Sequence, residues 1–150
     1  MPGLLVIAHA PLASALRSVA EHVYPDCARS LTVLDVLPET PPEEVEAQAA
    51  TLLQTLAPAE VLILTDVFGA TPCNIAQRLA DGVRIRVVTG VNVPMLWRAL
   101  CYAGEPLDAL VARALAGAVQ GAMLVGPAGT ASQATSPPEA DAKNHRHDRQ

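Results

Sequence analysis

The sequence predicts an α/β domain in which helices cover both faces of a doubly wound, mostly parallel sheet. Short apolar runs without polar alternation recur along the chain, as is typical of strands buried on both faces. Segments with an apolar stripe at helical spacing lie between these runs, which implies right-handed crossovers. Hydrophobic residues make up 51% of the chain but aromatic residues only 3%, so we expect a core of Ala, Val and Leu.

The first half of the chain supplies two strands and two helices. Residues 4–8 form an unbroken apolar run, which predicts a strand. Residues 11–24 carry one apolar stripe and begin with a proline, which suits a first helical turn. Residues 31–36 predict the second strand. A second helix is expected from Thr40, an N-cap followed by proline, to about residue 56.

The second half repeats these signals. The run at 61–65 is the most hydrophobic of the predicted strands, and Thr71 before a proline again marks a helix start. Arg84 and Arg86 share one face of a later strand, which favours an exposed position in the sheet. The other elements predicted in this way are a strand at 83–88 and helices at 71–80, 94–103 and 106–119.

The carboxyl-terminal part is less regular. Residues 120–125 fit either a fifth strand or the end of the preceding helix, and we favour the strand. From residue 127 onward the composition shifts to Pro, Ser, Thr, Ala and charged residues, which favours a disordered tail. We therefore expect one folded domain at 1–126 and a tail at 127–150.

Charge and composition exclude several classes of protein. The net charge is −5 and the arginines are scattered, so no basic patch for nucleic acid is expected. No apolar run reaches the roughly 18 residues of a membrane span, and the amino terminus lacks the basic region of a signal peptide. The cysteines show no CxxC spacing, which favours free thiols in a reducing cytosol. These features predict a cytoplasmic protein without direct membrane insertion.

Cofactor and metal motifs are not apparent either. The chain has no GxGxxG and no P-loop. His145 and His147 flank an arginine in the tail, but two histidines are too few ligands for a metal site. We expect neither a cofactor nor a metal.

His9 and Asp66 each come directly after a predicted strand. Reactive groups in an open α/β sheet gather beyond the carboxyl ends of the strands. If the strand order is 2-1-3-4, the two strands that end at these residues are neighbours. A carboxylate that accepts a hydrogen bond from one imidazole nitrogen fixes the tautomer and leaves the other nitrogen as a nucleophile. The pair therefore predicts a phosphoryl group carried on His9, with Asp66 as a second catalytic residue.

The turn after Asp66 is a candidate phosphate-binding site. Gly69, Ala70 and Thr71 lead into a helix whose first N–H groups are unsatisfied, and such helix ends bind phosphate. Thr71 adds a hydroxyl, so we count it among the catalytic residues. Asn92, after the fourth strand, is expected at the rim. Helix caps and tight turns explain the same residues without any ligand.

Three segments carry a family resemblance. They are Ile-Ala-His at 7–9, Thr-Asp-Val-Phe-Gly-Ala-Thr-Pro-Cys-Asn at 65–74, and Thr-Gly-Val-Asn-Val-Pro-Met-Leu at 89–96. Together they resemble the enzyme IIA component, mannose type, of the bacterial phosphoenolpyruvate-dependent sugar phosphotransferase system. The resemblance covers residues 3–126 and implies the strand order 2-1-3-4. The second segment is the most specific, with Asp, an aromatic, small residues, Ser or Thr, Pro and Asn in that order.

The resemblance implies roles and partners. His9 would be the phosphorylated residue, Asp66 the carboxylate bonded to it and Thr71 the hydroxyl near the phosphoryl group. The donor would be the histidine phosphocarrier protein and the acceptor an enzyme IIB domain in sugar uptake. A homodimer is also implied, in which an antiparallel strand, matched by 120–125, pairs with the partner's sheet. Two features depart from the family: Ala10 replaces a common glycine, and no IIB segment follows within these residues.

Other functions stay open at this stage. The same chemistry would serve a stand-alone regulatory phosphoprotein that signals to a non-transport partner. A non-catalytic small-molecule-binding module shares the fold class but would leave the His9 and Asp66 pattern unexplained. A response-regulator receiver domain would need an acidic cluster at the end of the first strand, where this chain has Ala8 and His9.

Overall fold

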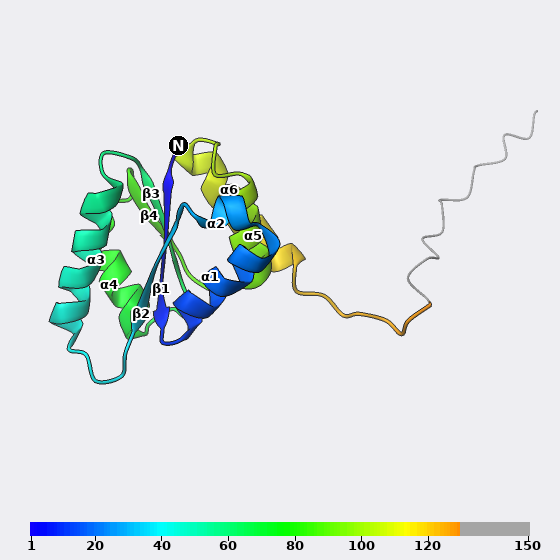
Figure 1. Cartoon of the computed structure of the whole chain (residues 1–150), viewed down its shortest axis with the longest axis horizontal. Helices are drawn as coiled ribbons and strands as arrows, with labels where there is room; N and C mark the ends of the chain where they lie inside the picture. The colour runs from blue at the N-terminus through cyan, green and yellow to red at the C-terminus, as the bar shows by residue number, and fades with distance from the viewer. Residues whose placement is uncertain (130–150) are drawn as a thin grey trace, which may run out of the picture.

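Four parallel strands form the centre of the computed structural model, which describes residues 1–129 (Figure 1). Their order in the sheet is β2-β1-β3-β4, which confirms the order implied by the resemblance. β1 lies in the middle of the sheet, hydrogen-bonded to both β2 and β3. The strands are β1 (Gly3–His9), β2 (Leu31–Val36), β3 (Val61–Thr65) and β4 (Ile85–Val88).

Helices cover both faces of this sheet. α3 and α4 lie on one face, and α1, α2, α5 and α6 lie on the other (Figure 1). None of the helices within residues 1–129 has both the length and the hydropathy needed to cross a membrane. The helices are α1 (Leu12–Val23), α2 (Pro25–Ala28), α3 (Pro42–Leu56), α4 (Thr71–Leu79), α5 (Val93–Cys101) and α6 (Leu107–Gln120).

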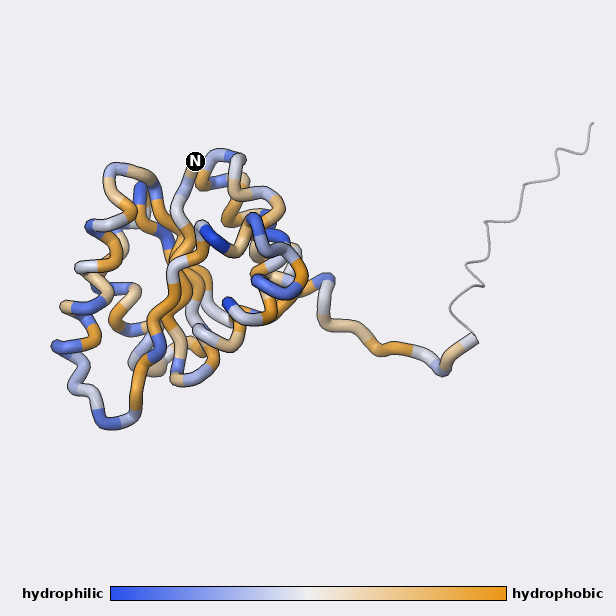
Figure 2. Tube along the Cα trace, viewed as in Figure 1, coloured by the Kyte–Doolittle hydropathy of each residue, from blue (hydrophilic) through white to orange (hydrophobic). Residues whose placement is uncertain are grey.

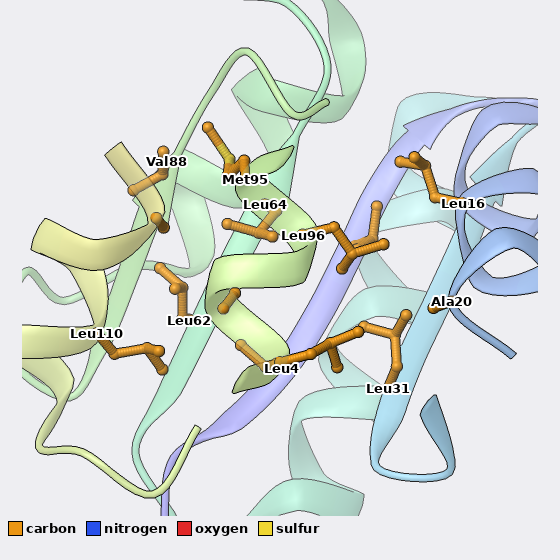
Figure 3. Close-up of a cluster of buried hydrophobic side chains, with 14 of the residues drawn as sticks. Leu4, Leu16, Ala20, Leu31, Leu62, Leu64, Val88, Met95, Leu96 and Leu110 are labelled. Carbon is orange, nitrogen blue, oxygen red and sulfur yellow. The ribbon is translucent and has the colours of Figure 1, made fainter. Parts of the chain in front are cut away.

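Each face of the sheet buries its own hydrophobic cluster. Alternate side chains of a strand point to opposite faces, so an unbroken apolar run serves both clusters. Leu4 and Leu64 pack under α1, α5 and α6, and Figure 3 shows them among their neighbours. Leu5 and Ile63 pack under α3 and α4. Figure 2 shows the same pattern, with hydrophobic residues along the strands and hydrophilic residues on the outside of α3.

The end of α6 corrects the expectation of a fifth strand. Gln120 is the last residue of α6, and residues 121–125 form no strand in this chain. The helical bonding continues through this point, with the N–H of Gly121 donating to the carbonyl of Gly117 at 3.0 Å. A strand forms only by pairing with a neighbouring strand, and among the described residues the sheet consists of β1 to β4. The tail predicted from residue 127 lies outside the described residues from residue 130 onward, as do His145 and His147.

Two helix starts differ from the prediction. α3 begins at Pro42 with Pro41 at the cap position, so Thr40 is not its N-cap. α4 begins at Thr71 itself, with Ala70 at the cap position. Neither cap position supplies a side-chain hydrogen bond. The cap-then-proline pattern therefore located both helices but placed the cap of α3 one residue early and that of α4 one residue late.

β4 begins two residues later than predicted. Oδ1 of Asp81 accepts hydrogen bonds from the backbone N–H groups of Val83 and Arg84, at 2.8 Å and 2.7 Å. These two residues are thereby held in a loop before the strand. A third bond, from the N–H of Ile85, is the largest cause of the lowered pKa of Asp81. The exposed position inferred for this strand is confirmed, because β4 is an edge strand.

Close contact between α5 and α6 requires glycine at position 117. We expect Gly117→Ala to destabilise the protein, although alanine is ordinarily the better helix former. An added Cβ would lie 2.5 Å from Cγ of Arg98 and 2.9 Å from the carbonyl oxygen of Pro94. Overpacking of this kind costs about 1–3 kcal/mol, to be measured by urea unfolding. Gly104→Ala is the control, since its Cβ would meet nothing within 4 Å. A Gly117→Ala protein as stable as the wild type would contradict this packing.

Candidate active site

The structure brings His9 and Asp66 together at the carboxyl ends of β1 and β3. Oδ2 of Asp66 lies 2.6 Å from Nδ1 of His9 and also accepts the backbone N–H of His9 at 3.0 Å. Oδ1 accepts the N–H of Val67 at 2.9 Å. The side chain of His9 is 52% exposed, whereas that of Asp66 is only 13% exposed. The imidazole is therefore open to a partner while its carboxylate is largely screened from water.

The bonding of Asp66 keeps its carboxylate ionised. Partial burial acts to raise the pKa of Asp66, but the hydrogen bonds from the His9 backbone, the His9 ring and Val67 outweigh it. The pKa therefore lies below its ordinary value of 3.8. An ionised carboxylate only accepts hydrogen bonds, so Nδ1 of His9 must be the protonated nitrogen. In the neutral imidazole with this tautomer, Nε2 carries the lone pair that can attack an electrophile.

This lowered pKa predicts how stability depends on pH. A carboxyl group with a lowered folded-state pKa stabilises the fold above its unfolded pKa, and that contribution is lost as pH falls through the folded value. We therefore expect the wild type to lose stability relative to Asp66→Asn as the pH drops below about 3.8. Urea unfolding of both proteins between neutral and acidic pH measures this difference. A difference that stays constant over the whole range would contradict the bonding described for Asp66.

The loop between β4 and α5 fixes the backbone at Asp66 through hydrogen bonds. The N–H of Gly90 donates to the carbonyl of Asp66 at 3.0 Å, and that of Val91 donates to the carbonyl of Thr65 at 2.9 Å. Gly90 has a φ of +83°, a conformation that favours glycine. The backbone on both sides of the Asp66 side chain is thus fixed by a neighbouring loop.

Asn92, which we expected at the rim, is bonded within the fold. Its Oδ1 accepts the N–H of Met95 at 2.8 Å and caps α5, and its Nδ2 donates to the carbonyl of Ala118 at 3.3 Å. Both ends of the amide are therefore used within the fold, and neither contact involves His9 or Asp66. Asn92 ties the loop that supports Asp66 to α6, so the simpler interpretation as a helix cap applies.

The predicted phosphate-binding turn leads directly from Asp66 into α4. Gly69 has a φ of +86°, and Ala70 is extended at the cap position. Thr71 is the first residue of α4 and is half-buried. No side chain caps this helix and its first turn holds no acidic residue. Its amino end therefore retains unneutralised N–H dipoles next to the His9–Asp66 pair.

Sequence reasoning missed Asp35, a second carboxylate at this edge of the sheet. Asp35 lies on β2, paired in register with Ala8 of β1. It accepts the backbone N–H of Ser14 at 3.0 Å and is also bonded to the Ser14 hydroxyl. One donor at the amino end of α1, the helix that begins shortly after His9, is thus already used. The only signal in the sequence was an acidic residue close to the end of a largely apolar strand.

Apolar side chains lie exposed beside the His9–Asp66 pair. Val67 and Phe68 follow Asp66 directly and are 51% and 72% exposed. Leu37 follows β2 at the same edge of the sheet and is 53% exposed. We call these three residues the apolar rim.

A comparison with protein families identifies the chain. A family model described as the PTS system fructose IIA component, EIIA-man, matches residues 3–115. The chain belongs to the EIIA-man family. Membership of this family supports a phosphotransfer role in a sugar phosphotransferase system. A search of curated proteins found no match.

Solved structures have the same fold as this EIIA-man chain. The mannose/sorbose-specific IIA subunit from Enterococcus faecalis is 24% identical with a TM-score of 0.77, over 84% of this chain and 96% of that one. A phosphotransferase component EIIA from Streptococcus agalactiae is 22% identical, with a TM-score of 0.72 over 82% and 96%. A PTS IIA protein associated with the fucose utilization operon of Streptococcus pneumoniae is 26% identical, with a TM-score of 0.63 over 76% and 88%.

Proposed function

We propose that this chain accepts a phosphoryl group on His9 from the histidine phosphocarrier protein and passes it to an enzyme IIB-like acceptor in sugar uptake. The observation that carries the proposal is the 2.6 Å contact between Nδ1 of His9 and Oδ2 of Asp66. It directs the nucleophilic lone pair to Nε2 and places a negative charge beside the ring.

The reaction is a transfer between two nitrogen atoms. Nε2 of His9 attacks the phosphorus of the donor's phosphohistidine, so that the donor P–N bond breaks and a new N–P bond forms. The proton on Nδ1 stays in place, held by Asp66. The ring becomes cationic as the bond forms, and the Asp66 carboxylate stabilises that charge. Transfer to the acceptor reverses the same steps.

The amino end of α4 would bind the phosphoryl oxygens. N–H groups at Gly69, Ala70 and Thr71 and the dipole of α4 favour an anion there, and the Thr71 hydroxyl adds a donor. Phosphoryl transfer needs mainly positioning and charge stabilisation, which this end of the helix supplies. The apolar rim supports a protein partner, because exposed apolar groups gathered beside a reactive side chain are typical of docking surfaces.

For the assembly, we propose the homodimer that the family resemblance implies, formed through residues 120–125. β4 is an open edge strand, and Met123, Leu124 and Val125 are 71%, 100% and 80% exposed. An unpaired edge and an exposed apolar segment are each stabilised when covered. The molar mass of the protein in solution tests this pairing.

Labelling tests the proposed function. The full chain is incubated with phosphoenolpyruvate and the upstream proteins of the relay, and we expect one acid-labile, base-stable phosphate per chain. The acceptor is then found by adding candidate IIB proteins to the isolated phosphoprotein and following loss of its label. A stable phosphate ester on a serine or threonine, or no incorporation at all, would contradict the proposal.

A further inference from the structure

Asp35 bonds to the first turn of α1 through both of its carboxylate oxygens. Oδ1 accepts the backbone N–H of Ser14 at 3.0 Å, and Oδ2 is bonded to the Ser14 hydroxyl. The hydroxyl oxygen is also 3.1 Å from the carbonyl of Pro11. A hydroxyl has a single hydrogen, and the charged carboxylate is the stronger acceptor. Ser14 and Asp35 thus form a half-buried, charge-assisted pair between α1 and β2.

The Ser14–Asp35 pair holds one end of the short segment from His9 to Ser14, called the link below. The N–H of His9 donates to Asp66, directly after β3, and the N–H of Ala10 donates to the carbonyl of Val36 on β2 at 3.0 Å. Ser14, where the link enters α1, is held by Asp35. The segment from His9 to Ser14 is therefore fixed at its start by Asp66 and at its far end by β2. Loss of the Asp35 bonds would remove the hydrogen bonds between this far end and β2.

Because of Asp35, the amino ends of α1 and α4 differ in charge. α1 has no acidic residue in its own first turn and no side-chain cap from Pro11, so Asp35 supplies the negative charge at its amino end. α4 has neither a side-chain cap nor an acidic residue in its first turn. Asp35 already occupies a donor in the first turn of α1, whereas no side chain caps the first turn of α4. Free N–H donors favour the phosphoryl group at α4 over α1.

We propose that Asp35 is a positioning residue for phosphoryl transfer. This inference rests on the proposed function of His9. Through Ser14 it fixes the link between His9 and α1, and by neutralising α1 it leaves α4 to bind the phosphoryl group. The hydrogen bonds of Asp35 go to Ser14, and none goes to His9 or to the apolar rim. Its removal should therefore change the rate of transfer and leave the binding of the partner unchanged.

The test measures transfer from the phosphorylated histidine phosphocarrier protein, well below the unfolding temperature of each variant. Asp35→Asn should lower the maximal rate about tenfold, equivalent to about 1.4 kcal/mol, with an unchanged half-saturating donor concentration. Ser14→Ala should lower it about threefold, as for the loss of one hydrogen bond. The double variant should be no slower than Asp35→Asn alone, because both changes break one unit. Ser14→Thr, which keeps the hydroxyl, should restore the rate.

Glu21→Gln is the matched control. Glu21 is a carboxylate of α1 that pairs with Arg17, and its replacement should leave the rate unchanged. A merely structural role for Asp35 would lower the unfolding midpoint while leaving the maximal rate at the wild-type value, and this result would overturn the inference. If Asp35→Asn does not fold, Ser14→Ala and Ser14→Thr decide the question. Labelling that persists in His9→Gln would instead overturn the proposed function itself, so the two failures are distinguishable.

Discussion

Replacement of His9 by glutamine should abolish phosphoryl incorporation completely. Glutamine keeps a polar side chain that can donate to Asp66, but its amide nitrogen is not a nucleophile at neutral pH. The side chain of His9 is about half exposed and its backbone bond to Asp66 is kept, so the fold should remain intact. Intact-protein mass spectrometry after incubation with the phosphorylated donor measures the incorporation.

His22→Gln is the control for this experiment. His22 is an exposed residue near the end of α1 and has no contact with Asp66. This variant should incorporate phosphate as the wild type does. Incorporation into His9→Gln at the wild-type level would show that another residue accepts the phosphoryl group.

Replacement of Asp66 by asparagine should slow transfer by about 10²- to 10³-fold. Asparagine has nearly the same shape, but it lacks the charge that stabilises the cationic ring. Its amide group could also donate to Nδ1, which would place the proton on Nε2 and remove the nucleophilic lone pair. Rapid-quench measurements of the single transfer step give the rate directly.

Two further variants separate this effect from a general loss of charge or stability. Asp81 likewise accepts backbone hydrogen bonds and has a lowered pKa. It lies before the amino end of β4, whereas His9 and Asp66 lie at the carboxyl ends of their strands. Asp81→Asn should leave the transfer rate unchanged. Thr71→Ala should cause a loss of less than about tenfold, since it removes one hydrogen-bond donor. Equal losses in Asp66→Asn and Asp81→Asn would argue against a specific role for Asp66.

The fold followed from local patterns because its strands are buried on both faces. Runs such as 4–8 and 61–65 have to be apolar throughout, so their positions were predicted to within a residue or two. Boundaries failed where hydrogen bonds outside the strands decided them. Asp81 holds the residues before Ile85 in a loop, and the helical bonding of α6 continues to Gly121, where a strand was expected. The apolar pattern of a segment shows neither set of bonds.

The candidate site was predictable only in part, for a related reason. His9 and Asp66 stand at strand ends, and the sheet order then makes them neighbours. Asn92 has the same kind of position, but its Oδ1 caps α5 and its Nδ2 donates to the carbonyl of Ala118 on α6, a contact that depends on how α6 packs. Asp35 escaped notice because its importance depends on Ser14, which is distant from it in sequence. Contacts between elements thus decide which polar residues at the sheet edge remain free for chemistry.

Nuclear magnetic resonance of the phosphorylated protein tests the central claim most directly. With ¹⁵N-labelled histidine, coupling between ³¹P and the ring nitrogens shows which atom carries the phosphoryl group. The contact between Asp66 and Nδ1 predicts a single phosphohistidine, at position 9, with phosphorus on Nε2 and a proton on Nδ1. Phosphorus on Nδ1 of His9, or on any other residue, would contradict the account.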